Sequence, residues 1–241
     1  ATVVGIMLFF LITGVIATMS LVGMIASSEA TKNVKENSVL VINLSGVMKE
    51  RSQDNVLNKL TRNATGNPGL ENTLAAIKKA KDNKDVKGIY LEAGLFSTDF
   101  ASLQELRQAL ADFRKCGKWI VAYGETYTQG TYYLASVANK VYLNPQGSLD
   151  WHGIAAEPMF VKDLLAKFGV KMQVVKVGKY KSATEMFTED KMSDANREQV
   201  KRYIDGLWGN MCKAVSTSRS ISVDKLNEYA DNMLLFDDQK T

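Results

Sequence analysis

Val86-Lys87-Gly88-Ile89-Tyr90-Leu91-Glu92, followed by residues 100–115 and then by Trp119-Ile120-Val121-Ala122-Tyr123, is the stretch that decides the fold. The two short runs are rich in β-branched and aromatic residues and are predicted to be strands. Between them, apolar residues recur at helical spacing, at Leu103, Leu106, Ala109, Leu110 and Phe113. A strand, a helix and a strand joined by short turns are typical of βα units with a parallel sheet.

The same alternation continues on both sides of this stretch. Upstream, residues 38–44 form a nearly continuous apolar run that predicts a buried strand, and residues 70–83 have helical spacing. Downstream we expect a strand at 141–143, a helix at 157–168, a strand at 170–177 and helices from 193 to 219 and from 222 to 229. The fold class is therefore α/β with a mostly parallel sheet and right-handed crossovers. Periodicity alone does not separate a doubly wound sheet from a spiral of ββα units.

The first 28 residues carry no charge, and Glu29 is the first charged residue. A stretch of this length is long enough to cross a hydrocarbon core of about 30 Å as one helix. Ala26-Ser27-Ser28 is similar to a signal cleavage site, but we interpret residues 1–28 as a retained transmembrane anchor in contact with lipid. Residues 29–37 are then a linker, and residues 38–241 form one domain.

Composition excludes several classes of function. The net charge of +4 is too small to indicate nucleic-acid binding, and basic residues with interleaved aromatics form no stripe. Cys116 and Cys212 belong to no cluster with metal-ligand spacing, so we expect no metal site and no disulfide. Nothing in the sequence indicates an organic cofactor.

The candidate for chemistry is Lys181, which follows the glycine turn at Gly178. A lysine can act as a general base when its ammonium is desolvated or lies beside other positive charge, which lowers its pKa. Lys176 and Lys179 supply such charge, although a solvated basic loop is the simpler interpretation of these residues.

Several motifs favour a role for Lys181. These are Val177-Gly178-Lys179-Tyr180-Lys181-Ser182-Ala183 with Glu185-Met186-Phe187 and Met192-Ser193 behind it, residues 124–136, Asn144-Pro145-Gln146-Gly147 and His152-Gly153. In this order they resemble the signal peptide peptidase (SppA, or protease IV) family, peptidase S49, in the N-terminal half of its long two-lobed form.

The resemblance implies a crotonase- or ClpP-like spiral of ββα units, with a C-terminal lobe beyond this sequence. It also implies a serine protease in which Lys181 is the base of a Ser-Lys dyad and the substrate is a signal-peptide remnant. A homo-oligomer is expected as well, with one span in the bacterial inner membrane and the soluble lobe on the periplasmic side.

Two departures from the family pattern concern the rest of the dyad. Gln129, followed by Gly130, occupies the position where catalytic lobes carry the serine, and glutamine has no nucleophilic oxygen. After the second strand, Gly94 is followed by the bulky Leu95, where catalytic lobes have a glycine pair for the oxyanion hole. We interpret Gly94 and Leu95 as packing or as a wall of a substrate groove, and we expect this lobe alone to be inactive.

Local hydroxyls are poor substitutes for the serine. Ser182 is adjacent to Lys181 and is predicted to be a helix N-cap, with Glu185 completing a capping box. Thr128 and Thr131 remain minor candidates, and His152 beside Asp150 is predicted to stabilise a loop. The alternative functions are a scaffold that is not catalytic and an acyl-CoA enzyme of the crotonase fold.

Overall fold

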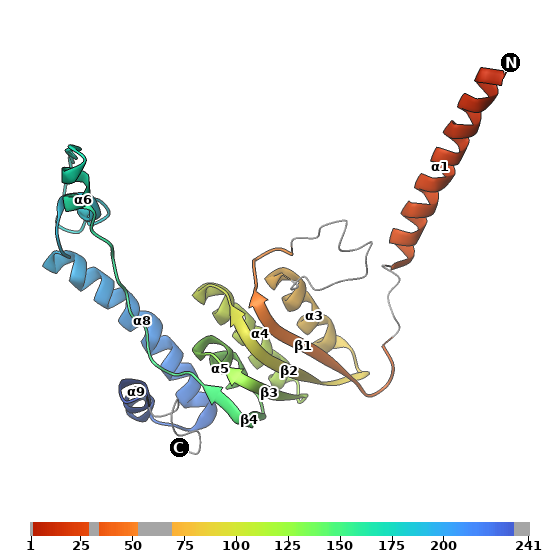
Figure 1. The fold of residues 1–241 in the computed structure, drawn as a ribbon. Coiled ribbons are helices and arrows are strands. Elements are labelled where there is room, and N and C mark those ends of the chain that lie inside the picture. The colour runs from red at the N-terminus through yellow and green to blue at the C-terminus, as the bar shows by residue number, and fades with distance from the viewer. Residues whose placement is uncertain (1, 29–33, 53–68, 234–241) are drawn as a thin grey trace.

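The computed structural model describes residues 2–28, 34–52 and 69–233. The elements within these ranges are α1 Thr2–Ser28, β1 Ser38–Val47, α3 Leu70–Asp82, β2 Val86–Ser97, α4 Phe100–Lys115, β3 Trp119–Tyr127, α5 Gln129–Ala135, β4 Lys140–Leu149, α6 Lys162–Lys167, α7 Glu185–Thr188, α8 Asp194–Arg219 and α9 Val223–Asp231 (Figure 1).

The N-terminal helix α1 projects from the rest of the chain (Figure 1). Its window Val3–Ser20 is long and apolar enough to cross a membrane, and none of that window is buried. Length and composition therefore fit the predicted anchor. Most of the predicted linker, residues 29–33, lies outside the described residues.

The four strands form one parallel sheet in the order β1-β2-β3-β4, which confirms the α/β class and the parallel sheet predicted from the sequence. All four strands are longer than predicted. Strand β3 continues through Gly124 to Tyr127, and β4 continues through Pro145 to Leu149, with a register shift between them at Gly124 and Thr126. A glycine and a proline on these strands therefore mark an irregularity in pairing and not the end of a strand.

One face of the sheet forms the core with α3, α4 and α5. Alternate strand residues are fully or nearly buried there, and Leu106, Leu110 and Phe113 of α4 are inaccessible to solvent. The sheet residues in this core are Ile42, Leu44, Ile89, Leu91, Ile120 and Ala122. The helical spacing that predicted α3 and α4 therefore identifies the residues that cover the sheet.

Helix α8 connects the sheet to a peripheral region that we call the arm, residues 154–193. Near the sheet, the ring of Trp208 in α8 lies 4.9 Å from that of Trp151, and Trp151 Nε1 donates to the carbonyl of Leu226 at 3.0 Å. At its other end, α8 begins with the predicted N-cap Ser193, whose hydroxyl accepts from Asn196 N. The arm with α6 lies at this far end (Figure 1).

The predicted secondary structure of the arm is largely wrong. The helix predicted over 157–168 is confined to Lys162–Lys167, no residue of which is buried. Residues 170–177, predicted to be a strand, form no strand in the described chain. An apolar pattern becomes regular structure when a partner surface or a neighbouring strand stabilises it, and the described residues provide the arm with neither.

Candidate active site

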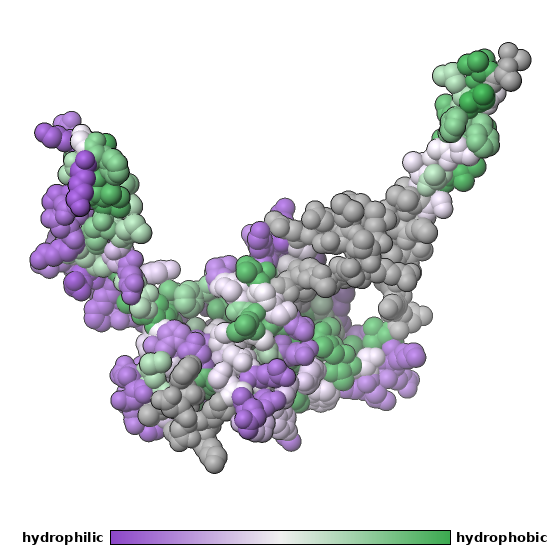
Figure 2. Space-filling view, in the orientation of Figure 1, coloured by the Kyte–Doolittle hydropathy of each residue, from purple (hydrophilic) through white to green (hydrophobic). Residues whose placement is uncertain are grey.

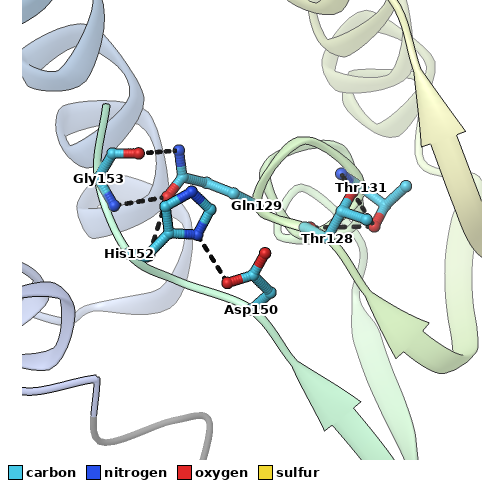
Figure 3. A network of polar contacts seen from close by, with 6 residues as sticks. All are labelled: Thr128, Gln129, Thr131, Asp150, His152 and Gly153. Carbon is cyan, nitrogen blue, oxygen red and sulfur yellow. Dashed lines mark hydrogen bonds and ion pairs between the residues drawn. The ribbon is translucent and has the colours of Figure 1, made fainter. Parts of the chain in front are cut away.

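Gln129 lies at the start of α5, at the carboxyl end of β3, which is the position that the resemblance to the family assigns to a serine. Its side-chain oxygen accepts hydrogen bonds from the backbone N–H groups of His152 at 3.1 Å and Gly153 at 2.9 Å. Its side-chain nitrogen donates to the carbonyl of Gly153 at 3.1 Å (Figure 3). The amide thus fastens the loop after β4 to the beginning of α5, which is a structural role.

The N-terminus of α5 is capped by Thr128. The hydroxyl of Thr128 accepts from Thr131 N at 3.2 Å and lies 3.1 Å from the hydroxyl of Thr131. Thr131 is fully buried and also donates to the carbonyl of Thr128. Both hydroxyls are therefore engaged in capping the helix, which argues against either one as a nucleophile.

Asp150 and His152 form the pair that their spacing suggests. His152 Nδ1 lies 2.6 Å from a carboxylate oxygen of Asp150, and both side chains are about half exposed. Figure 3 shows the imidazole beside the Gln129 amide, while the two threonine hydroxyls point toward each other. Within the described chain no hydroxyl is hydrogen-bonded to this imidazole, so the pair lacks the nucleophile of a triad.

Gly94 and Leu95 lie near the carboxyl end of β2, at the same edge of the sheet as the start of α5. A Cβ atom on Gly94 would lie 3.2 Å from the carbonyl of Leu44, so this position has little room for a side chain. Leu95 is 73% exposed, whereas the following Phe96 is buried in the core. The packing role predicted for this stretch is therefore filled by Phe96, and the exposed Leu95 could still form a wall of a groove.

Lys181 lies on the arm, in a turn that begins at Gly178, which has a φ of +97°. The hydroxyl of Tyr180 donates to Glu198 at 3.0 Å, and that of Ser182 donates to the side chain of Gln199 at 3.3 Å. These contacts attach the turn to the first part of α8. The prediction that Ser182 is an N-cap is wrong, because Thr184 precedes α7 and Ser182 points to α8 instead.

Glu185 is the main anchor of this turn. Its buried carboxylate accepts from the hydroxyl of Ser193 at 2.7 Å, from the amide of Asn196 at 3.0 Å and from Ser193 N at 3.2 Å. The Ser193 hydroxyl in particular holds the pKa of Glu185 below its usual value, and Lys176, with its ammonium 4.0 Å away, contributes less. The carboxylate thereby joins the lysine turn to the N-terminus of α8.

The structure does not bring Lys181 and Gln129 together within one chain. The turn with Lys181 contacts Glu198 and Gln199, whereas the end of α8 that packs near α5 includes Ala214, whose carbonyl accepts from Arg107 at 2.9 Å. These two ends of the helix are separated by roughly 20 Å of helical rise. Lys181 is exposed, so the described residues do not desolvate it.

One important side chain, Arg107, was not identified from the sequence, and another, Glu185, was assigned the wrong partner. Arg107 is 7% exposed and donates to the carbonyls of Tyr133 and Ala214 and to the hydroxyls of Ser136 and Ser218, and its guanidinium lies over the ring of Tyr133. The sequence did contain a signal for Arg107, which is a positively charged residue on the otherwise apolar face of α4. The predicted capping box of Ser182 and Glu185 is wrong, because the Glu185 carboxylate accepts from Ser193 and Asn196 instead, and its burial depends on the packing of the arm against α8.

Comparisons with known proteins cover most of the chain. Residues 112–240 match peptidase family S49. Protease 4 of Salmonella typhi is 39% identical over 228 residues, which are 91% of this chain and 36% of that protein. Protease 4 of Haemophilus influenzae is 36% identical over 66% of this chain and 26% of its own length. The chloroplastic serine protease SPPA of Arabidopsis thaliana is 26% identical over 77% of this chain and 26% of its own length.

This chain therefore spans little more than a third of the first relative and about a quarter of the other two. Among solved structures, an enoyl-CoA hydratase of Geobacillus kaustophilus aligns over 86% of this chain and 89% of its own, with 12% identity and a TM-score of 0.32. A score this low supports no conclusion about function.

Proposed function

Because this chain belongs to peptidase family S49, we propose that it is the anchored lobe of a membrane-bound serine endopeptidase, to which it contributes Lys181 as general base. Its substrates are cleaved signal peptides, which are apolar and lie in or near the membrane. Residues 1–28 hold the lobe at the bacterial inner membrane, with the lobe on the periplasmic side. The protein acts as a homo-oligomer.

The separation of Lys181 from the sheet is the observation on which this proposal rests. The position at the start of α5 is occupied by Gln129, which is engaged in fastening a loop. The serine partner must then come from outside this sequence, on a second lobe or on a neighbouring copy. Contact with that partner also provides the desolvation that an exposed lysine lacks.

The chemistry follows from these two groups. The amine of Lys181 takes the proton of the serine hydroxyl as the serine oxygen attacks the scissile carbonyl carbon. The ammonium then returns the proton to the leaving amine as the peptide C–N bond breaks, which leaves an acyl-enzyme. Water, activated by the same lysine, hydrolyses the ester. Backbone N–H groups near Gly94 and Gly130 are candidates for lining the groove, with Leu95 as a wall.

A scaffold without catalytic function is the second candidate, and the hydrogen-bonded amide of Gln129 favours it. In that case the lobe holds subunits together, and Lys181 has no chemical role. Both candidates are consistent with membership of the family.

The test is a pair of lysine variants in the complete protein, assayed on a fluorogenic apolar peptide in detergent. Lys181→Ala is expected to lower kcat by about 10²–10⁴-fold, the usual contribution of a general base. Lys179→Ala is the matched control, since it removes the same charge from the same turn, and it is expected to retain activity within about twofold. Unaltered peptidase activity in Lys181→Ala would refute the base assignment and favour the scaffold.

A further inference from the structure

The face of the sheet opposite α3, α4 and α5 is uncovered within the described chain. On this face Val39 and Val41 are 39% and 59% exposed, and Trp119 and Tyr142 are 39% and 50% exposed. Register places Val39, Gly88 and Trp119 in one row across three strands. A Cβ atom on Gly88 would lie 2.3 Å from the indole of Trp119, so the glycine allows this ring to lie flat on the sheet.

Such a face is unusual for a parallel sheet. All-parallel sheets occur almost only where both faces are covered, because their strands are apolar on both sides. Here the exposed side chains on one face include two valines, a tryptophan and a tyrosine from three different strands. A contiguous apolar surface of this kind marks an interaction site.

The arm of the same chain also exposes large apolar side chains. Val175 and Val177 are 91% and 85% exposed, and Phe168 and Met159 are 77% and 71% exposed. Figure 2 shows that the hydrophobic residues of the arm gather on the side that faces the hollow next to the sheet domain, with hydrophilic residues on the outer side. The arm is thus amphipathic but has almost no core of its own.

We propose that the uncovered sheet face of one copy, defined by Val39, Val41, Trp119 and Tyr142, is covered by the arm of a second copy. Both apolar surfaces lie on the same chain, and α8 holds the arm away from its own sheet (Figure 1). This inference rests on the homo-oligomer proposed above, but not on the peptidase chemistry.

Charge supports the same pairing. Residues 159–181, the lysine-rich end of the arm, contain six lysines and one aspartate, and two of these lysines lie beside Asp190 and Glu185. The whole arm, with seven lysines and five acidic residues, has a net charge of +2. Toward the carboxyl ends of the strands, Glu92 and Glu125 are exposed. The lysine-rich end of the arm therefore matches the acidic end of the sheet, which gives the contact a direction.

The contact joins two different surfaces, so two kinds of assembly satisfy it. Two copies that exchange arms reciprocally form a two-fold dimer. Copies that each give an arm to one neighbour and receive an arm from another form a closed ring or an open filament.

The test uses the full chain in detergent, with Cys116→Ser and Cys212→Ala as background. One population carries Val41→Cys and the other Val175→Cys, and a short bismaleimide is added to each population alone and to their mixture. We expect a cross-linked dimer on a denaturing gel only in the mixture. Val223→Cys, on a valine of α9 that is 37% exposed, replaces Val41→Cys in the control and is expected to give no product.

Several outcomes would overturn the inference. Cross-linking of Val41→Cys copies alone would show that sheet faces pair with each other, and cross-linking of Val175→Cys copies alone would show that arms pair. An oligomer by light scattering without the mixed product would leave the oligomer standing and refute this contact. A monomer at all concentrations would refute the oligomer, and peptidase activity would be judged separately.

A second measurement separates loss of contact from misfolding. Val41→Asp, at a side chain already largely exposed, is expected to raise the dissociation constant at least about tenfold. The melting temperature, compared at a concentration where both proteins are monomeric, should stay unchanged. Val223→Asp is the control and should leave the oligomer intact. If instead a thiol at position 175 is shielded from a water-soluble maleimide only in anionic bilayers, the arm binds lipid and the inference is wrong.

Discussion

Replacement of Glu185 by glutamine is expected to loosen the lysine turn without unfolding the sheet domain. The carboxylate accepts three hydrogen bonds from Ser193 and Asn196. A hydrogen bond to a charged group contributes about 1.5–3 kcal/mol, and the single amide oxygen of glutamine can keep only some of these bonds. We therefore expect the free energy of local opening of residues 178–196 to fall by about 2 kcal/mol.

The assay is hydrogen–deuterium exchange followed by mass spectrometry. A loss of about 2 kcal/mol corresponds to roughly thirtyfold faster exchange for peptides that cover residues 178–196. Peptides from β2 should not change. Glu189→Gln is the matched control, because Glu189 is exposed and lies four residues away on the same arm. Equal exchange in the two variants would refute the anchoring role of Glu185.

Acid should have the same local effect as this substitution. The pKa of Glu185 is lowered in the folded chain, chiefly by the Ser193 hydroxyl. A carboxylate whose pKa is lowered on folding stabilises the fold above its ordinary pKa, and that contribution is lost as pH falls through the lowered value. Acid should therefore accelerate exchange of the arm in the natural protein, after correction for intrinsic rates, and have little further effect in Glu185→Gln.

Three further predictions concern stability and reactivity. Arg107→Leu removes the hydrogen bonds that a buried guanidinium donates to two carbonyls and two hydroxyls, and it should lower the free energy of unfolding by about 3 kcal/mol in a urea titration, with partial recovery in Arg107→Lys. Gly147→Ala places a methyl group 2.0 Å from a carbonyl oxygen of β3 and should destabilise the fold by at least about 2 kcal/mol. Gly209→Ala, at an open position in the interior of α8, should stabilise the fold by about 0.5–1 kcal/mol. Thermal melts of the two variants test both expectations. Cys116 should react with a thiol reagent in the native state and Cys212 only on unfolding, because burial raises the pKa of the Cys212 thiol to about 12.

The sheet domain could be predicted from sequence because the residues that the apolar pattern marks are the residues that pack in its core. Apolar residues in α4 recur at helical spacing and all lie against the same sheet, so local pattern and tertiary contact point to one structure. The arm could not be predicted in this way. Leu164 and Phe168 are spaced to lie on one face of the helix predicted over 157–168, and they are 54% and 77% exposed. Periodicity indicates a face that needs a partner, and it does not say whether that partner belongs to the same chain.

The candidate site was predictable in part. The sequence shows that position 129 holds a glutamine, and this is enough to argue that a nucleophile is missing there. It does not show that the side chain binds the loop at Gly153, because that contact joins residues 24 apart in the chain. The role of Lys181 as a general base stays a prediction, because the side chain is exposed and its chemistry depends on the group that it contacts in the complete protein.

Helix α8 acts mechanically as a lever. Its 26 residues extend about 39 Å, and Trp208, which contacts Trp151, lies 14 residues after the first residue of the helix, Asp194. A tilt of about 5° about this contact moves the beginning of the helix, about 21 Å away, by roughly 2 Å, a shift on the scale that separates an amine within hydrogen-bond reach of a hydroxyl from one beyond it. We expect the packing of this indole pair to affect the position of the lysine turn, although the pair does not contact it.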